Sequence, residues 1–475
     1  MKYFLWIFLL GVWFDGQAKI QLPAILGNNM VLQRNAEVNI WGKASVGEKV
    51  KIETSWNDKV YRTHADMEGD WKIAIETSDA GGPYTVIISG ENKIVLEDIL
   101  LGEVWVSSGQ SNMEMPMTGF MGQPVEEGLE TTTRAQLFPN IRMFTVGRQS
   151  TPDPQSNCDG EWQRSTAETV GAFSAVAYFY AKELNIALDV PVGIITTNWG
   201  ASTIEAWTPV STLKAIDNID IDLALAGKER NNKAGYLYNG MISPITNFTA
   251  KGFIWYQGEA NLYNNNYKDY HKLLAAMIKQ WRADWGKDDM YFLYVQLAPY
   301  KYDGVDKITL PLIIENQYKT LEMVSKAGIV ATNDLGDKER IHPAKKKQVG
   351  SRLAYLALHK VYGLKGYPVS PTVKDILYNG EKVRLTFNYA DHDMNSFDYY
   401  AGEILGFEIA GRDQKFYKAI AKHIRWKNEI ELSCPEVKEP IAVRYAFRNF
   451  IDNTVRTISG LPLVPFRTDN WDDIH

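Results

Sequence analysis

The sequence predicts an α/β protein in which a doubly wound parallel sheet lies between two β-rich modules. Between about residues 99 and 360, near-continuous apolar segments alternate with helical segments, as expected for parallel strands covered on both faces. Residues 19–98 and 361–475 instead alternate apolar and polar positions between turn signals, which is typical of β-sandwich modules. A length of 475 residues, at roughly 150 residues per domain, also leaves room for about three domains.

Residues 1–18 differ from the rest of the chain. Lys2 precedes a continuous apolar run at 3–14, and small residues follow up to Ala18, a pattern that predicts a signal peptide cleaved after Ala18. Such a run forms roughly 18 Å of helix, which is shorter than the roughly 30 Å hydrocarbon core of a bilayer. We therefore expect export to the periplasm or the extracellular space, with no membrane span after cleavage. An uncleaved anchor or a buried helix is the alternative.

In the first module, 19–98, apolar and polar residues alternate at 38–41 and 50–53, which predicts strands. Turn signals at 47–48, 57–58, 68–70 and 81–83 separate these segments. The last module, 361–475, repeats the pattern after a linker marked by Pro368 and Pro371. Its predicted strands are 382–387, 406–409, 429–432 and 441–444.

The middle domain, 99–360, carries the parallel sheet. Its helices are predicted at 173–184, 267–285 and 345–356, the last just after Pro343, a residue common at the start of helices. Right-handed crossovers between parallel strands place the functional loops beyond the carboxyl ends of the strands. The predicted strands are 103–107, 141–146, 192–197, 253–256, 291–297 and 329–332.

Charge and cysteine content exclude several classes of function. Acidic residues outnumber basic ones by 57 to 51, giving a net charge of −6, so the overall field repels nucleic acid. Cys158 and Cys434 are too few for a disulfide framework and are expected to be free, although their pairing stays open. No His-Glu-x-x-His segment is present, and we expect neither a catalytic metal nor a cofactor.

The candidate nucleophile is Ser111. A buried strand ends here in the turn Gly109-Gln110-Ser111, which can present a hydroxyl at the rim of a parallel sheet. Met113 stands where the Gly-x-Ser-x-Gly elbow has its second glycine, so an α/β-hydrolase elbow is disfavoured. Alternatively, Ser111 caps the following helix.

A serine nucleophile needs a base, and His342 is the candidate. It lies in a loop between a predicted strand and a predicted helix, a position that commonly carries catalytic groups. The alternative is a surface histidine that caps the helix. The other histidines fall in β modules, within helices or at the end of the chain: His64, His271, His359, His392, His423 and His475.

Acyl transfer also needs hydrogen-bond donors for an oxyanion. Two further predicted strand ends offer them: the loop at 198–202 contains Gly200, and the loop at 255–261 contains Gln257. Each loop is ordinary by itself, but together with the Ser111 and His342 loops they form a set at one edge of the sheet.

These segments resemble the conserved blocks of the SGNH hydrolase superfamily, specifically the sialate O-acetylesterase family of carbohydrate esterases. The flanks at 22–34 and 444–469 are similar to the opening and closing β modules of bacterial members, so the resemblance covers nearly the whole mature chain. The matching blocks are Gly-Gln-Ser-Asn-Met at 109–113, Asn-Trp-Gly at 198–200, Trp-Tyr-Gln-Gly-Glu at 255–259 and Ile-His-Pro at 341–343.

The resemblance implies an SGNH-like fold and a serine esterase that removes acetyl groups from sugar hydroxyls. Ser111 would attack the acetyl carbonyl and His342 would transfer the protons. The N–H groups of Ser111 and Gly200 and the side chain of Gln257 would hold the oxyanion. Gln257 departs from the superfamily, which has Asn in its third block.

The third triad member is open. The superfamily has Asp three residues before the histidine, and that position is Glu339 here. Asp334 and Asp337 are rivals, and a Ser–His pair with a backbone carbonyl orienting the ring is a further alternative.

The expected partner is an O-acetylated sugar, and the oligomeric state is not indicated. Sialic acid carries a carboxylate, for which Arg142, Arg340 and Lys345 are candidate cations. Acetylxylan or another hemicellulose is the alternative substrate for the same machinery. A carbohydrate-binding protein without catalysis is the alternative from a different class, because the chain has 14 tryptophans.

Overall fold

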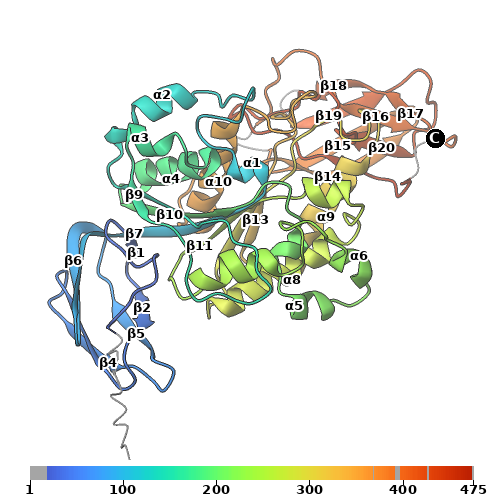
Figure 1. Cartoon of the computed structure of the whole chain (residues 1–475). Helices are drawn as coiled ribbons and strands as arrows, with labels where there is room; N and C mark the ends of the chain where they lie inside the picture. The colour runs from blue at the N-terminus through green and yellow to red at the C-terminus, as the bar shows by residue number, and fades with distance from the viewer. Residues whose placement is uncertain (1–18, 367–368, 391–395, 425–426, 473–475) are drawn as a thin grey trace, which may run out of the picture.

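The computed structural model describes residues 19–366, 369–390, 396–424 and 427–472. The predicted signal peptide at 1–18 and Pro368 of the predicted linker lie outside the described residues. A central α/β domain separates an N-terminal β module from a C-terminal one (Figure 1).

The central sheet has the strand order β13-β12-β11-β7-β10-β8-β9. All neighbours in this order pair in parallel except β8 and β9, which are antiparallel, so the sheet is mixed. The strands that carry the candidate site lie side by side, with β7 between β10 and β11. The bounds are β7 (Lys93–Gly109), β8 (Ile141–Thr145), β9 (Trp162–Arg164), β10 (Val192–Asn198), β11 (Gly252–Tyr256), β12 (Tyr291–Val295) and β13 (Ala327–Val330).

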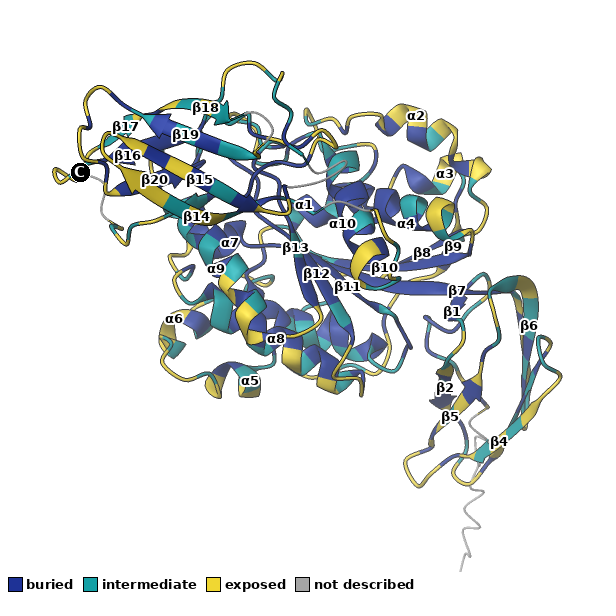
Figure 2. Ribbon diagram, turned by 180° about the vertical axis from the view of Figure 1, so that it is seen from behind, coloured by how far each residue is buried: buried dark blue, intermediate teal, exposed yellow. Residues whose placement is uncertain are grey.

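Helices cover both faces of this sheet, which explains why its strands are buried almost throughout (Figure 2). On one face α4 (Ala175–Leu188) packs against α10 (Lys346–Lys360), and on the other α8 (Tyr270–Asp284) packs against α9 (Thr309–Met323) (Figure 1). Helix α9 is not among the helices predicted from the sequence. Its Pro311 lies in the first turn, where proline is tolerated because the first N–H groups have no partner within the helix.

Shorter helices lie in the loops between these elements. They are α1 (Ser111–Glu114), α2 (Gly128–Thr133), α3 (Ala167–Val170), α5 (Val210–Lys214), α6 (Ile221–Leu225) and α7 (Glu259–Tyr263), with single turns at Ala135–Leu137, Ile204–Trp207, Tyr238–Ile242 and Ser243–Ile245.

The N-terminal module shares strand β7 with the central sheet. The expected boundary at 98/99 falls inside this strand, whose first half is partly exposed and whose second half is fully buried. The backbone continues across that point, and the buried residues of the two regions form one hydrophobic core. β2 and β5 form a separate pair. β1 and β6 pair with β7, and β3 and β4 extend that sheet from β6. The strands are β1 (Val31–Gln33), β2 (Glu37–Lys43), β3 (Lys49–Thr54), β4 (Val60–His64), β5 (Asp70–Glu76) and β6 (Gly81–Ser89).

The C-terminal module has a core of its own between two four-stranded sheets, β14-β15-β19-β18 and β17-β16-β20-β21. Arg467 of this module binds Glu315 of α9 through two hydrogen bonds of 2.7 and 2.8 Å. This pair helps to dock the module on the central domain. The strands are β14 (Thr372–Asn379), β15 (Lys382–Asn388), β16 (Phe407–Ala410), β17 (Phe416–Lys418), β18 (Ile420–Ile424), β19 (Glu429–Ser433), β20 (Ala442–Tyr445) and β21 (Phe466–Arg467).

Cys158 and Cys434 are both buried and free, so the structure contains no bond between them. Within the described ranges, no helix has the length and apolar character needed to cross a bilayer. Among the residues that the structure describes, no group of three or more His, Cys, Asp or Glu side chains is placed to hold a metal ion.

Candidate active site

Ser111 lies just beyond the carboxyl end of β7, as the first residue of α1. The turn before it brings the backbone against β11. Gly109 has φ +143°, and a Cβ at this position would lie 2.2 Å from the carbonyl oxygen of Tyr256, so glycine is required. The turn thereby places the hydroxyl at the sheet edge.

His342 and Ser111 meet at this edge. Nε2 of His342 lies 2.8 Å from Oγ of Ser111, across 231 residues of chain. The other ring nitrogen, Nδ1, lies 2.8 Å from Oε1 of Gln123. Because Oε1 only accepts, Nδ1 carries the proton and Nε2 is left to accept the hydroxyl proton of Ser111. The ring therefore has the tautomer that a general base needs.

The loop between α1 and α2 positions Gln123. Gly119 has φ +80°, and a Cβ here would lie 2.2 Å from the carbonyl oxygen of Gln123. The tight turn that this glycine permits also presents Phe120, whose ring meets His342 edge-on at 5.1 Å between centroids. The N–H of Glu126 donates to the carbonyl of Ala344 at 2.9 Å, which ties the loop to the histidine loop.

The three acidic side chains considered for orienting His342 lie elsewhere. Glu339 is 66% exposed and accepts a hydrogen bond from Lys301 at 2.5 Å. Asp337 accepts from the N–H groups of Glu339 and Arg340. Asp334 forms a bidentate pair with Arg352 at 2.7 and 2.6 Å. The expectation of an acid on the ring is thus corrected: an amide side chain, not a carboxylate or a backbone carbonyl, occupies that place.

The Gly200 N–H, one of the expected oxyanion donors, lies beside Ser111. An ideal Cβ on Gly200 would be 3.4 Å from Cβ of Ser111. Its N–H, however, donates to Oε2 of Glu114 at 2.6 Å, and Glu114 also pairs with Arg148. The Ser111 N–H, as the first of its helix, has no acceptor within that helix. The two residues expected to donate are therefore neighbours, and Glu114 occupies the Gly200 N–H.

Gln257 does not point at Ser111. Its Nε2 donates to the carbonyl of Ser202 at 3.0 Å and to Oδ1 of Asn261 at 2.7 Å, and its Oε1 accepts from Tyr270 at 2.8 Å. The side chain is fully buried, with each of its polar atoms already bonded. The expected oxyanion role of Gln257 is therefore not supported by its position. The glutamine side chain, which is longer than the asparagine of the superfamily, bonds to Ser202, Asn261 and Tyr270 instead.

A buried polar network lies beneath the nucleophile. Asn112 donates to Glu259 at 2.5 Å and accepts from Nζ of Lys346 at 2.5 Å. Burial lowers the pKa of Lys346 to about 7, an effect that the Glu259 charge opposes. Burial also raises the pKa of Glu259. The network ties the start of α1 to the first residues of α7 and α10.

The same surroundings keep His342 neutral. Burial, followed by the positive charge of Lys346, lowers the pKa of His342 to about 4. The imidazole is therefore unprotonated at neutral pH and able to accept a proton, although it is a weak base. As a protonated group it would give up its proton readily.

Residues 101–359, more than half of the chain, match the family described as "Carbohydrate esterase, sialic acid-specific acetylesterase". This chain belongs to that family. The sialate O-acetylesterase of Homo sapiens is 27% identical over 395 residues, 74% of each chain, and that of Rattus norvegicus is 26% identical over 433 residues, 78% of this chain and 79% of the relative. XAC1771, a carbohydrate acetylesterase from Xanthomonas citri, has a TM-score of 0.85 and 34% identity over 95% of this chain and 100% of its own.

The esterase is thus a carboxylic ester hydrolase of sialate O-acetylesterase type, which overrules the alternative of a binding protein without catalysis. Its matched region contains all four loops described above. Sequence reasoning missed Gln123, Glu114 and Lys346 in this region. The glycines at 119 and 122 marked a tight turn after the nucleophile, but no local signal indicated which side chain from that turn reaches the histidine.

The cations considered for a substrate carboxylate are spread out. Arg142 lies near the start of β8 and forms a buried pair with Asp98 at 2.7 Å. Arg340 lies 3.8 Å from Asp337, and Lys345 precedes the first residue of α10. None of these contacts includes Ser111 or His342.

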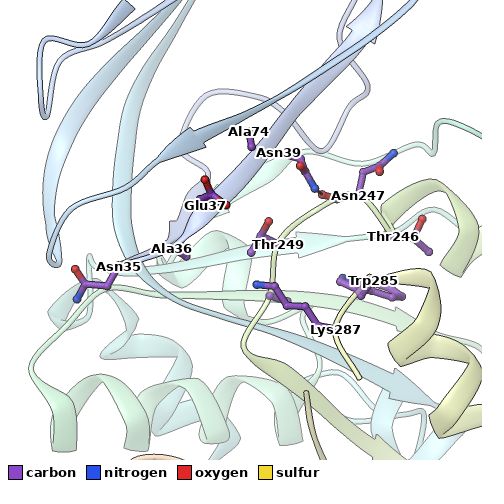
Figure 3. Close-up of a pocket in the computed structure, with 12 residues that line it drawn as sticks. Asn35, Ala36, Glu37, Asn39, Ala74, Thr246, Asn247, Thr249, Trp285 and Lys287 are labelled. Atoms are coloured by element: carbon purple, nitrogen blue, oxygen red, sulfur yellow. Dashed lines mark hydrogen bonds between the residues drawn. The ribbon is translucent and has the colours of Figure 1, made fainter. Parts of the chain in front are cut away.

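A cavity of about 470 Å³ opens between the N-terminal module and the central domain (Figure 3). Asn39 and Ala74 line it from β2 and β5, and Asn247, Trp285 and Lys287 line it from loops that precede β11 and β12 and from the end of α8. These loops lie at the amino ends of parallel strands, so the cavity is on the side of the sheet opposite Ser111. The site residues do not line it.

Proposed function

We propose that this esterase removes acetyl groups from hydroxyls of sialic acid through an acetyl-Ser111 intermediate. The 2.8 Å contact between Nε2 of His342 and Oγ of Ser111 carries the proposal. A nucleophile and a base within hydrogen-bonding reach, with the base oriented by a third group, is the arrangement that activates a serine. Here the third group is the amide of Gln123.

In the first half of the reaction, Oγ of Ser111 attacks the acetyl carbonyl carbon while its proton passes to Nε2 of His342. The carbonyl oxygen becomes the oxyanion, which the N–H groups of Ser111 and Gly200 would bind. As the tetrahedral species collapses, the bond to the sugar oxygen breaks and His342 gives its proton to that oxygen. The free sugar leaves, and the acetyl group remains on Ser111.

In the second half, water attacks the acetyl carbon and His342 accepts the water proton. Collapse of the second tetrahedral species breaks the bond to Oγ and releases acetate, and Nε2 returns its proton to Ser111. In each half of the reaction, His342 takes up one proton and then releases it. For Gly200 to serve in either half, Glu114 must withdraw from its N–H.

Trapping of the intermediate tests this mechanism. Hydrolysis of 4-nitrophenyl acetate, quenched in acid and followed by peptide mass spectrometry, should place one acetyl group on Ser111. Ser111→Ala and His342→Ala should each abolish acetate release, whereas Ser459→Ala, at an exposed serine of the C-terminal module, should leave it unchanged. Normal turnover by Ser111→Ala would overturn the proposal.

A comparison of two substrates tests which sugar the enzyme deacetylates. Acetate release should be faster from O-acetylated sialic acid than from acetylated xylo-oligosaccharides. The curated relatives named sialate O-acetylesterase support this choice. Preference for the xylo-oligosaccharide would assign the enzyme to hemicellulose instead.

We also propose an SGNH-type catalytic domain with β-sandwich-like flanking modules and export directed by residues 1–18. The parallel strands that end in the four loops and the paired sheets of the C-terminal module support the fold. The apolar run after Lys2 supports export. N-terminal sequencing of the secreted protein should begin at Lys19, and retention of residues 1–18 in the cytoplasm would contradict this proposal.

A further inference from the structure

Next to Gly200, two arginines converge on one aromatic ring. The guanidinium carbon of Arg148 lies 5.5 Å from the ring centroid of Trp199, and that of Arg230 lies 5.8 Å from it. Trp199 follows β10, and its N–H donates to the carbonyl of Gly109 at 3.1 Å. Because a cation close to an aromatic face is attracted by the ring quadrupole, Trp199 holds both guanidinium groups near the sheet edge that carries Ser111.

Hydrogen bonds fix the segments that carry the two arginines. Oγ of Ser150 donates to the carbonyl of Arg230 at 2.5 Å, which joins the segment after Arg148 to the segment of Arg230. Asn231 donates to the carbonyl of Gly200 at 2.7 Å. The arginines are thus anchored to the same loop that supplies the Gly200 N–H.

The charges at this position do not balance. Arg148 pairs with Glu114, which is only 16% exposed, while Arg148 itself is 54% exposed. Arg230 is exposed, and no carboxylate among the described residues pairs with it. One carboxylate faces two guanidinium groups, so a net positive charge remains at the loop of Trp199 and Gly200. A planar guanidinium is well suited to bind a carboxylate through two hydrogen bonds.

We propose that Arg148 and Arg230, held by Trp199, form the subsite that binds the carboxylate of an acidic sugar substrate. This inference rests on the proposed deacetylation of sialic acid at Ser111 and adds the residues that bind the carboxylate of that sugar. A substrate carboxylate at Arg148 competes with Glu114 for the guanidinium. Occupation of the subsite would therefore loosen the group that occupies the Gly200 N–H.

The test compares three substrates that differ in charge. They are O-acetylated sialic acid, its methyl ester, in which the carboxylate is neutralised, and 4-nitrophenyl acetate, which has no sugar. Arg230→Gln should lower kcat/KM for the charged sugar roughly tenfold, mainly by raising KM, because one charge-assisted contact is lost. For the methyl ester and 4-nitrophenyl acetate, kcat/KM should stay within about twofold.

Two further variants keep the test specific. Arg230→Lys should recover part of the loss, because the charge returns without the planar fork. Arg412→Gln, an arginine that is 84% exposed on the C-terminal module, should leave all three substrates unchanged. Arg148→Gln should also raise KM for the charged sugar. Because this change also removes the ion-pair partner of Glu114, Arg230→Gln is the more specific variant.

The outcomes separate this inference from the proposed function. If Arg230→Gln lowers kcat/KM equally for the charged sugar and its methyl ester, or for neither, the proposed carboxylate subsite is wrong. The esterase mechanism then still stands. If the unmodified enzyme hydrolyses none of the three substrates, the proposed function fails and the subsite fails with it. A selective rise in KM for the charged sugar in Arg230→Gln supports both.

Discussion

Nδ1 of His342 donates to Oε1 of Gln123 at 2.8 Å, so a neutral amide holds the ring where many hydrolases have a carboxylate. The amide fixes the tautomer and the orientation of the imidazole. Unlike a carboxylate, it adds no negative charge to stabilise the imidazolium that forms when His342 accepts a proton. The low pKa of His342, which follows from burial and then from Lys346, is consistent with this arrangement.

The contact with Gln123 predicts different effects for two substitutions. Gln123→Ala should lower kcat roughly tenfold, about 1.4 kcal/mol of barrier, because the ring loses the group that orients it. Gln123→Glu should preserve orientation and raise the pKa of His342, since an opposite charge favours the imidazolium. The acid limb of the pH profile of kcat/KM measures this shift. Gln163→Glu on β9 is the matched control. Equal activity of Gln123→Ala and the unmodified enzyme would show that the amide is not needed.

The pKa of His342, about 4, predicts the acid limb of activity. His342 must be neutral to accept a proton, so kcat/KM should stay level as pH falls to about 5 and decline through pH 4. A histidine at its ordinary pKa of about 6.5 would lose activity far earlier. A profile that declines through pH 6.5 would mean that His342 is not shielded as the structure indicates.

The buried charge of Lys346 predicts a second pH effect. Lys346→Met removes a positive charge that disfavours the imidazolium, so the pKa of His342 should rise and the acid limb should move to higher pH. Lys347→Met is the matched control, because this neighbour pairs with Glu127 on the surface. Thermal unfolding of both variants checks that the fold persists. An acid limb that stays in place in a folded Lys346→Met variant would contradict the electrostatic role.

Glu114 on the Gly200 N–H predicts a variant with higher turnover. A carboxylate at an oxyanion donor both occupies the donor and repels the developing negative charge. Glu114→Gln keeps the size of the side chain but removes the charge, so kcat for 4-nitrophenyl acetate should rise several-fold, a gain of about 1 kcal/mol. Steady-state kinetics of the variant beside Glu126→Gln, in the neighbouring loop, measures this. A fall in kcat would instead show that Glu114 supports the Gly200 loop in its active position.

The positions of the acidic side chains predict small effects for their removal. Glu339→Gln and Asp337→Asn should each change kcat/KM less than about threefold, below 1 kcal/mol, because both side chains bond at the surface and not to His342. Initial rates on 4-nitrophenyl acetate suffice to check this. A loss of a hundredfold in Glu339→Gln would mean that the loop rearranges when substrate binds and brings this carboxylate onto the ring.

The sequence predicted much of the fold because strand and helix periodicity directly reports which residues are buried. Strands β8, β10, β11, β12 and β13 appear within a few residues of their predicted bounds, as do α4, α8 and α10, whereas β7 begins earlier, at Lys93, and β9 was not predicted. The boundary at 98/99 was less predictable. Strand β7 changes from half-buried to fully buried without a turn, so the periodicity changes while the backbone continues.

The sequence by itself placed Ser111, Gly200 and His342 at one sheet edge, since each follows a strand, or lies in the loop after one, in a parallel arrangement. Only the tertiary structure decided which groups bond to them: Gln123 and not Glu339 on the imidazole, Glu114 on the Gly200 N–H, and Gln257 turned into the loop network. The physical reason is that strand ends are fixed by local burial. A hydrogen bond between loops, by contrast, depends on the path each loop takes across the packed core, which no short segment of sequence encodes.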